Sequence, residues 1–341
     1  MPRFLDEFET LASVLLAIAF AHLLDAKNVG WAAFSGYMVM RSQWQETLIR
    51  GGLRIAGTVA GAITACLLAG IFDQSELSVS LSVALVGAVT LYCAITKAHS
   101  YAWLFTGLTF SMVALDALQQ PAISVFAFAS TRVLEVVAGT CACLLVRALS
   151  TVTIRSWLAA TPLTKPKAKN TQASSRAIIH AALAGLALAL TPFLGRWMEL
   201  EYISQAAITI MAVMMVPLSA LTPNSNTVHT KNIHRLLGCT AGAVMAGVMV
   251  LCFGNSWLAM TLGMSLGVLL GRHIENSGRS YAYVGTQFAL VYLVLMVPDS
   301  YLDPSVESGL ARLGGIVTGA ILIEALRLLR SPWKGRRYVP E

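Results

Sequence analysis

Long uncharged runs constrain the fold of this chain more than any other feature of its sequence. A membrane-spanning helix needs about 20 mostly apolar residues, because an α-helix rises about 1.5 Å per residue and the hydrocarbon core is about 30 Å thick. Runs near that length recur along most of the chain, and only 12% of its residues are charged. Soluble domains carry about 25%. We therefore expect an all-α integral membrane protein with the lipid bilayer as its solvent.

Twelve apolar runs are predicted to cross the membrane. The run at 28–40 is short, so it must be tilted little or be flanked by snorkelling side chains. The longest connection, 150–175, is rich in Lys, Pro, Ser and Thr and is predicted to be a cytoplasmic linker. The other runs lie at residues 8–24, 53–72, 76–95, 100–118, 130–149, 176–195, 202–221, 235–253, 256–271, 280–297 and 309–329.

The basic residues predict the orientation. Alternating the twelve runs from a cytoplasmic N-terminus places all but four of the 24 Lys and Arg residues in cytoplasmic connections, tails or helix ends. We expect a bacterial inner-membrane protein, and the positive-inside rule then predicts that both termini, and the basic tail 332–341, lie in the cytoplasm. Basic residues spread in this way do not form a nucleic-acid-binding stripe. The six cysteines fall within predicted helices, where a thiol is a small packing residue, so we expect neither disulfides nor a metal or other cofactor.

The chain is predicted to be duplicated. The sequence Ser-Tyr-Ala-Trp at 100–103 reappears as Ser-Tyr-Ala-Tyr at 280–283, which is 180 residues later. Arg132 and Arg312 have the same separation, and Arg54 and Arg235 are 181 apart. One offset that aligns three landmarks indicates two homologous six-helix halves, 1–149 and 176–331, joined by the linker.

Each of these four arginines is followed seven residues later by a glycine. In the predicted topology two of the four helices run outward and two inward, which suggests inverted repeats of three helices within each half. Many secondary transporters have this architecture, with the substrate site near the midplane. The small residues would form a groove below each cation. Glycine at such spacing is also a common helix-packing device, and arginine at a helix end a common anchor, so both interpretations stay open.

The segment 31–62 carries a family resemblance. An apolar helix ends in Arg41, and a short polar connection leads to Arg54, which is followed by Gly57, Thr58 and Gly61. This pattern, repeated more weakly at 234–247, resembles the fusaric-acid-resistance or aromatic-acid-exporter family. Plant aluminium-activated malate transporters look like relatives with one such half per chain. The resemblance implies proton-driven efflux of aromatic carboxylates, often with a periplasmic adaptor protein.

A carboxylate that crosses a bilayer needs a cation to replace its hydration, and arginine offers a planar fork that matches it. Arg132 and Arg312 are the first candidates for the anion site, because they are predicted to lie on the non-cytoplasmic side, where positive charge is avoided. Arg54 and Arg235 are predicted as its cytoplasmic entry. Flat surfaces for an aromatic substrate could come from aromatic residues near the same helix ends, which equally suit an interfacial aromatic belt. These residues are Trp31, Tyr37, Tyr101 and Tyr281, with Phe34, Trp103 and Tyr283 beside them.

Proton coupling would need a titratable group within the membrane. Glu135 lies three residues after Arg132 on the same helix face, so the two can pair. A purely structural bridge between them fits equally well. Glu324 and His180 are weaker candidates, which could instead cap or hydrogen-bond neighbouring helices.

The sequence contains no phosphate-binding loop, metal-spaced cluster or nucleophile elbow, so we do not expect an enzyme. The leading hypothesis is a secondary transporter that exports small organic anions. An anion channel of the malate type, or a non-transporting membrane subunit that assists a partner, remains as an alternative. A homo-oligomer is compatible with each of these.

Overall fold

The computed structural model describes residues 2–71, 74–157, 174–222, 225–253, 256–297 and 306–334. These residues form helices, turns and connections without a strand, and each of the twelve predicted runs contains a helix. Seven helices are long and apolar enough to cross a membrane by length and composition. An all-α multi-pass membrane protein is therefore confirmed, while the count of twelve crossings stays a prediction. The seven are Trp44–Ile71, Glu76–Thr96, Ser100–Gln119, Val125–Val152, Ser175–Trp197, Thr227–Phe253 and Gly309–Leu329.

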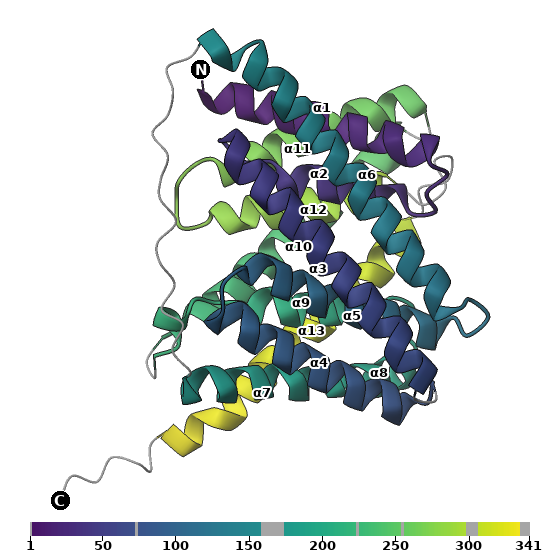
Figure 1. Cartoon of the computed structure of the whole chain (residues 1–341), viewed down its shortest axis with the longest axis vertical. Coiled ribbons are helices and arrows are strands. Elements are labelled where there is room, and N and C mark those ends of the chain that lie inside the picture. Colours follow the sequence, from purple (N-terminus) through teal and green to yellow (C-terminus); the bar gives the residue numbers. More distant parts are fainter. Residues whose placement is uncertain are drawn as a thin grey trace, which may run out of the picture. The chain divides into compact units, whose positions relative to one another are not determined.

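The chain divides into two compact units. Unit 1 consists of Met1–Val59, Ser130–Ala168 and Leu237–Leu310. Its centre is built by α1 (Pro2–Leu23), α2 (Val29–Val39), α11 (Trp257–Glu275) and α12 (Ala282–Met296) (Figure 1). Helix α1 packs against α2 and α11, and α12 packs against α11 and α2. Their shared core is apolar, with Tyr292 and Phe288 of α12 among its largest buried side chains.

Unit 2 consists of Ala60–Ala129, Lys169–Leu236 and Ala311–Glu341. Its centre is built by α4 (Glu76–Thr96), α5 (Ser100–Gln119), α7 (Ser175–Ala189), the short α8 (Thr191–Trp197) and α9 (Ser204–Met214). Helix α4 packs against α5 and α7, and α9 packs against the same two helices.

Four long helices contribute residues to both units. They are α3 (Trp44–Ile71), α6 (Val125–Val152), α10 (Thr227–Phe253) and α13 (Val306–Lys334). Each has 27 to 29 residues. At about 1.5 Å per residue they are roughly 40 Å long, which exceeds the hydrocarbon core. These are the helices that carry the four arginine and glycine pairs.

Each compact unit takes helices from both halves of the sequence. Helices α1 and α2 bury their apolar faces against α11 and α12, and α4 and α5 bury theirs against α7 and α9. The predicted repeats 1–149 and 176–331 are therefore not two separate bundles in space. Their boundaries along the sequence stay a prediction. Most of the predicted linker and of the tail 332–341 lies outside the described residues, although α6 reaches Val152 and a 3-10 turn follows at Arg155–Trp157.

Backbone turns support the duplication independently of side chains. Asp25 and Glu199, 174 residues apart, both have a positive φ, of 51° and 52°, just after α1 and α8. His99 and Gly278, 179 apart, have φ of 56° and 69° shortly before α5 and α12. The left-handed region favours glycine, so three other residues there mark backbone positions that the fold imposes. Among the described residues, every positive φ belongs to one of these two pairs.

The eighth predicted run, 202–221, is wrong in its extent. Helix α9 ends at Met214, and an extended stretch leads to a 3-10 turn at Leu218–Ala220. Pro217 explains the stop, because proline lacks an N–H and disfavours the helical conformation of the residue before it. As a result α9 and α2 both have 11 residues. Each is roughly 16 Å long, about half the hydrocarbon thickness.

Candidate functional site

Two of the predicted arginines meet on one face of α2 in unit 1. Arg54 of α3 is 2% exposed. Its Nη2 donates a hydrogen bond to Ser35 Oγ at 2.9 Å, and its guanidinium lies 5.3 Å from the centre of the Phe34 ring. The Arg132 guanidinium, from α6, lies 4.8 Å from the centre of the Trp31 ring. The contacted residues are three and four positions apart, so they share a face of α2.

A buried carboxylate lies beside Arg132. Glu135 is 0% exposed, and its Oε2 accepts a hydrogen bond from Arg132 Nη1 at 3.0 Å. Its Oε1 accepts a hydrogen bond at 3.2 Å from the backbone N–H of Asn28, the N-cap residue of α2. A helix N-terminus favours negative charge, so the carboxylate is held from two sides. The predicted contact between Arg132 and Glu135 is confirmed, and its role in coupling stays a prediction.

The other two arginines meet at α9 in unit 2. Arg235 of α10 is 5% exposed and donates from Nε to Thr209 Oγ1 at 3.0 Å. The guanidinium of Arg312, from α13, lies 4.8 Å from the centre of the Tyr202 ring, just before α9 begins. The structure thus groups Arg54 with Arg132 and Arg235 with Arg312. Arg132 and Arg312, the pair predicted from the repeat, belong to different units.

The two arginine sites match in detail. Ser35 Oγ donates to the carbonyl of Trp31 at 2.8 Å while it accepts from its arginine. Thr209 Oγ1 donates to the carbonyl of Gln205, also at 2.8 Å, while it accepts from Arg235. In each case a hydroxyl bonded one turn back along its own helix is aimed at a guanidinium from a long helix. This correspondence indicates that α2 and α9 are equivalent elements of the two halves.

The glycines seven residues after each arginine are packing positions. A Cβ at Gly139 would overlap the carbonyl oxygen of Ala32 in α2, and a Cβ at Gly319 would overlap that of Ala206 in α9. Gly61 and Gly242 meet the backbone of α5 and α12 in the same way. The expected groove below each cation is therefore filled by a neighbouring helix backbone. Close helix contact through small residues is common in membrane proteins.

Sequence reasoning missed the two hydroxyl residues, Ser35 and Thr209, that accept hydrogen bonds from Arg54 and Arg235. Ser35 and Thr209 are 174 positions apart, whereas Arg54 and Arg235 are 181 apart. The chain between hydroxyl and arginine is thus seven residues longer in the second half, where the extended stretch and the 3-10 turn follow α9. A repeat search that allowed two offsets could have found the pair. Tyr202 and Asn28 gave no comparable signal.

Tyr37 belongs to a separate polar cluster at the C-terminal end of α2. It is fully buried, and its hydroxyl donates to Glu275 Oε2 at 2.9 Å. The guanidinium of Arg272 lies 5.7 Å from the centre of its ring and donates to the carbonyl of Met40 at 3.3 Å. Arg41 donates to the same carbonyl at 2.7 Å. The resolved partners of Tyr37 are therefore Glu275 and Arg272 of α11, and not the arginines of the predicted anion site.

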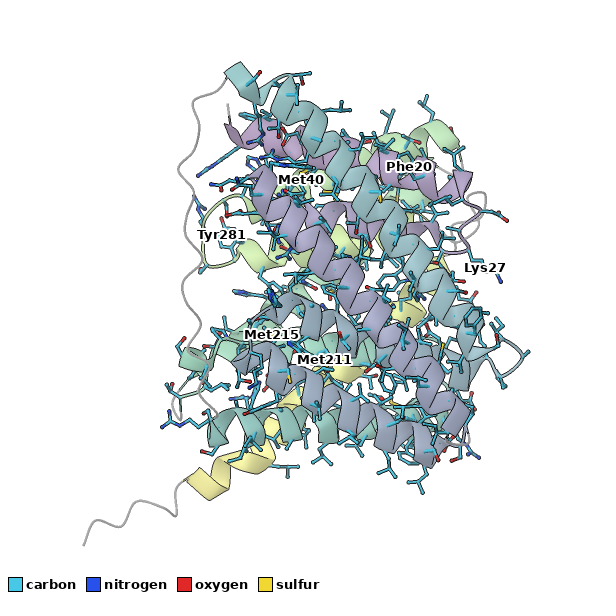
Figure 2. All side chains as sticks on the ribbon, in the orientation of Figure 1. Phe20, Lys27, Met40, Met211, Met215 and Tyr281 are labelled. Carbon is cyan, nitrogen blue, oxygen red and sulfur yellow. The ribbon has the colours of Figure 1, made fainter. Side chains whose placement is uncertain are left out.

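Basic side chains hold the last carbonyls of α9 as well. His180 Nε2 lies 2.7 Å from the carbonyl oxygen of Met214, and Lys231 Nζ donates to that of Met215 at 2.5 Å. Figure 2 labels Met215 after α9 and Met40, which follows α2 in the other unit. The final carbonyls of a helix have no partner within it, and cations are favourable there. His180 thus meets the alternative expectation that it bonds a neighbouring helix.

Glu324 joins two long helices. It accepts hydrogen bonds from Asn232 Nδ2 at 3.2 Å and Arg327 Nε at 2.7 Å, and it lies 2.8 Å from His229 Nδ1. His229 and Asn232 come from α10, while Glu324 is on α13. It is twelve residues from Arg312 in sequence, which is about 18 Å along the helix.

The remaining predicted aromatics make local contacts. The Tyr101 ring lies 4.6 Å from that of Phe105 on the same helix. Tyr281 is 38% exposed, and its hydroxyl accepts from Arg279 at 2.7 Å. Of the seven aromatics predicted to form a binding surface, Trp31 and Phe34 have resolved ring contacts with site arginines, namely Arg132 and Arg54.

The chemistry of these sites suits carboxylates. Charged groups placed deep in a membrane protein are costly and usually functional. A guanidinium binds a carboxylate through two parallel N–H groups, and aromatic rings can stack on its face. Within the described ranges, no group of three or more His, Cys, Asp and Glu could hold a metal ion.

Comparison with protein families assigns the chain. The model of the fusaric acid resistance protein family matches residues 7–167, and that of the fusaric acid resistance protein-like family matches residues 173–325. The chain belongs to the fusaric acid resistance protein family. This is a family of membrane transport proteins, and one match in each half agrees with the duplication. Comparisons with curated proteins and with solved structures found no match.

Proposed function

We propose that this member of the fusaric acid resistance protein family is an inner-membrane secondary transporter that exports small organic anions, aromatic carboxylates foremost. The observation that carries the proposal is the convergence, in each unit, of two arginines from different long helices on one 11-residue helix or on the residues just before it. Export is coupled to the proton gradient in this proposal, and both termini lie in the cytoplasm.

The short helices support transport because of their length. Helices α2 and α9 are about half as long as the hydrocarbon core is thick. Many secondary transporters use discontinuous helices whose ends meet the substrate near the midplane. A carboxylate at such a place would exchange its hydration for the two guanidinium groups.

Trp31 and Phe34 support an aromatic substrate in unit 1, since each ring already accepts a flat guanidinium. Tyr202 provides the corresponding ring for Arg312 in unit 2. Glu135 is the proton-responsive group of the proposal. Glu324, His180, Tyr37, Tyr101 and Tyr281 have less support, because their resolved contacts are not with the four site arginines. A periplasmic adaptor, which the family resemblance suggests, is a further part of the proposal, and a homo-oligomer is compatible with it.

Flux into liposomes tests the proposal. Purified protein is reconstituted with and without an imposed proton gradient, and entry of radiolabelled benzoate is measured. Flux that depends on the proton gradient and exceeds the entry into protein-free liposomes supports the transporter. Current that follows the benzoate potential and ignores the proton gradient would instead support the channel. If no organic anion produced any flux, the remaining hypothesis would be that the protein is a non-transporting membrane subunit.

A further inference from the structure

The carboxylate of Glu135 occupies the place that a transported carboxylate would take in unit 1. It contacts the Arg132 guanidinium at 3.0 Å and the N–H of Asn28 at 3.2 Å. The Trp31 ring, which would stack on an aromatic substrate, lies 4.8 Å from the same guanidinium. The side chain of Glu135 is 0% exposed. A guanidinium fork, a helix N-terminal N–H and an aromatic face are the groups that bind an aromatic carboxylate.

We propose that Glu135 is an internal competitor of the transported anion, and that a proton on Glu135 admits the anion to Arg132. This inference rests on the anion site of the proposed function and adds the sense of its coupling: a proton and an anion that bind together move in the same direction, so export follows the outward gradient of the anion and carries a proton with it. A proton from water binds the Glu135 carboxylate and cancels its charge. The incoming carboxylate then takes its place against the guanidinium, so one proton and one anion bind together.

Electrostatics requires this order. Two carboxylates that share one buried cation repel each other, and the second would be an uncompensated charge in a medium of low dielectric constant. Protonation of one carboxylate restores a single ion pair. Glu135 is the carboxylate that must be protonated if the anion is to bind in its ionised form.

The surroundings of the buried carboxylate leave it one strong ionic partner among the described residues. Arg132 faces it from its own helix, and the Asn28 backbone N–H faces it from the start of α2. The connection before α2 also carries Asp25 and Lys27, which are both exposed. Arg54, from α3, is engaged with Ser35 farther along α2.

The coupling predicts how affinity varies with pH. Because the protonated form of Glu135 favours the anion, affinity should fall as pH rises, by up to about tenfold per pH unit. Glu135→Gln removes the competing charge and nearly preserves the shape of the side chain. Its affinity should be high and independent of pH.

Calorimetry on the full-length protein in lipid nanodiscs tests this coupling with benzoate as the probe. Titrations in two buffers of different ionisation enthalpy count the protons taken up per benzoate, from about pH 6 to about pH 8, where benzoate stays ionised. Wild type should take up as much as one proton, and Glu135→Gln none. Glu76→Gln is the matched control, because Glu76 pairs with Arg196 at 3.1 Å on the surface. It should behave as wild type.

The outcomes separate this inference from the proposed function. Benzoate that binds wild type without proton uptake, with an affinity independent of pH, would overturn the inference and leave the anion site standing. This arm does not require any variant to fold. Unchanged proton uptake in folded Glu135→Gln would also overturn it. If wild type binds no benzoate or other aromatic carboxylate, the proposed function and this inference both fail.

Discussion

Gly139→Ala should loosen the contact that positions the arginine site of unit 1. A Cβ at this position of α6 meets the carbonyl oxygen and carbon of Ala32 in the backbone of α2, together with Cβ of Ser35. A flexible side chain could move away at little cost, but a helix backbone must shift as a whole. Over-packing of this kind costs about 1–3 kcal/mol. The greater helix propensity of alanine offsets at most about 1 kcal/mol of that cost.

Gly52→Ala is the matched control, because it is the same substitution inside a helix of the same unit. A Cβ there meets nothing within 4 Å, so only the gain in helix propensity remains. The two variants should therefore differ in stability by roughly 2 kcal/mol, with Gly139→Ala the less stable.

Thermal unfolding of both variants in the same detergent, followed by tryptophan fluorescence, measures the difference. We expect Gly139→Ala to melt a few degrees below wild type and Gly52→Ala at or slightly above it. Equal melting temperatures for the two variants would show that α6 does not press on α2, and the geometry of the site would have to be reconsidered.

Three further predictions concern individual polar contacts. Ser35→Ala should weaken benzoate binding several-fold, as measured by calorimetry, because it removes the hydroxyl that orients Arg54. Unchanged binding would mean that this hydrogen bond does not position Arg54 for the anion. Burial alone would raise the pKa of Asp6, which precedes the first apolar run, but the attraction and hydrogen bonding of Arg272 hold that pKa below its ordinary value of 3.8. The pair therefore stabilises the fold above about pH 4, and this stability should be lost as pH falls through the lowered pKa. Asp6→Asn should melt at a lower temperature than wild type at neutral pH, and its melting temperature should no longer fall with this acid transition. Melting temperatures of Asp6→Asn and wild type that fall in parallel with pH would refute this prediction. Tyr37→Phe removes one hydrogen bond to a carboxylate and should lower stability by about 1–3 kcal/mol without altering benzoate affinity, which binding and melting on the same sample can check.

The sequence was sufficient to predict the helices and one contact. Each predicted apolar run contains a helix, because the bilayer accepts few other structures, although the run 176–195 is divided between α7 and α8. The spacing of Arg132 and Glu135 predicted their ion pair, since neighbours on a helix face need no tertiary information. Pro217 could have signalled the early end of α9, but the apolar length of 202–221 was given more weight.

The arrangement of the helices could not be predicted in this way. Nothing in the local pattern says that α2 packs against α12, more than 240 residues away, because apolar faces of similar length are interchangeable until they pack. The contacts of Ser35 and Thr209 with their arginines depend on that packing. The burial of Tyr37 has the same origin, since its partner Glu275 comes from α11.

The central claim is that the four arginines that converge on α2 and α9 from the long helices bind the transported anion. Benzoate flux into proteoliposomes, compared between wild type and the double variant Arg132→Gln with Arg312→Gln, tests it most directly. The double variant must keep its helix content and elution volume, and Arg196→Ala is the control because its ion pair with Glu76 is on the surface. The account predicts at least a roughly tenfold loss of flux in the double variant, because each lost charge-assisted contact is worth about 1.5–3 kcal/mol, and wild-type flux in the control. Wild-type flux in a folded double variant would contradict it.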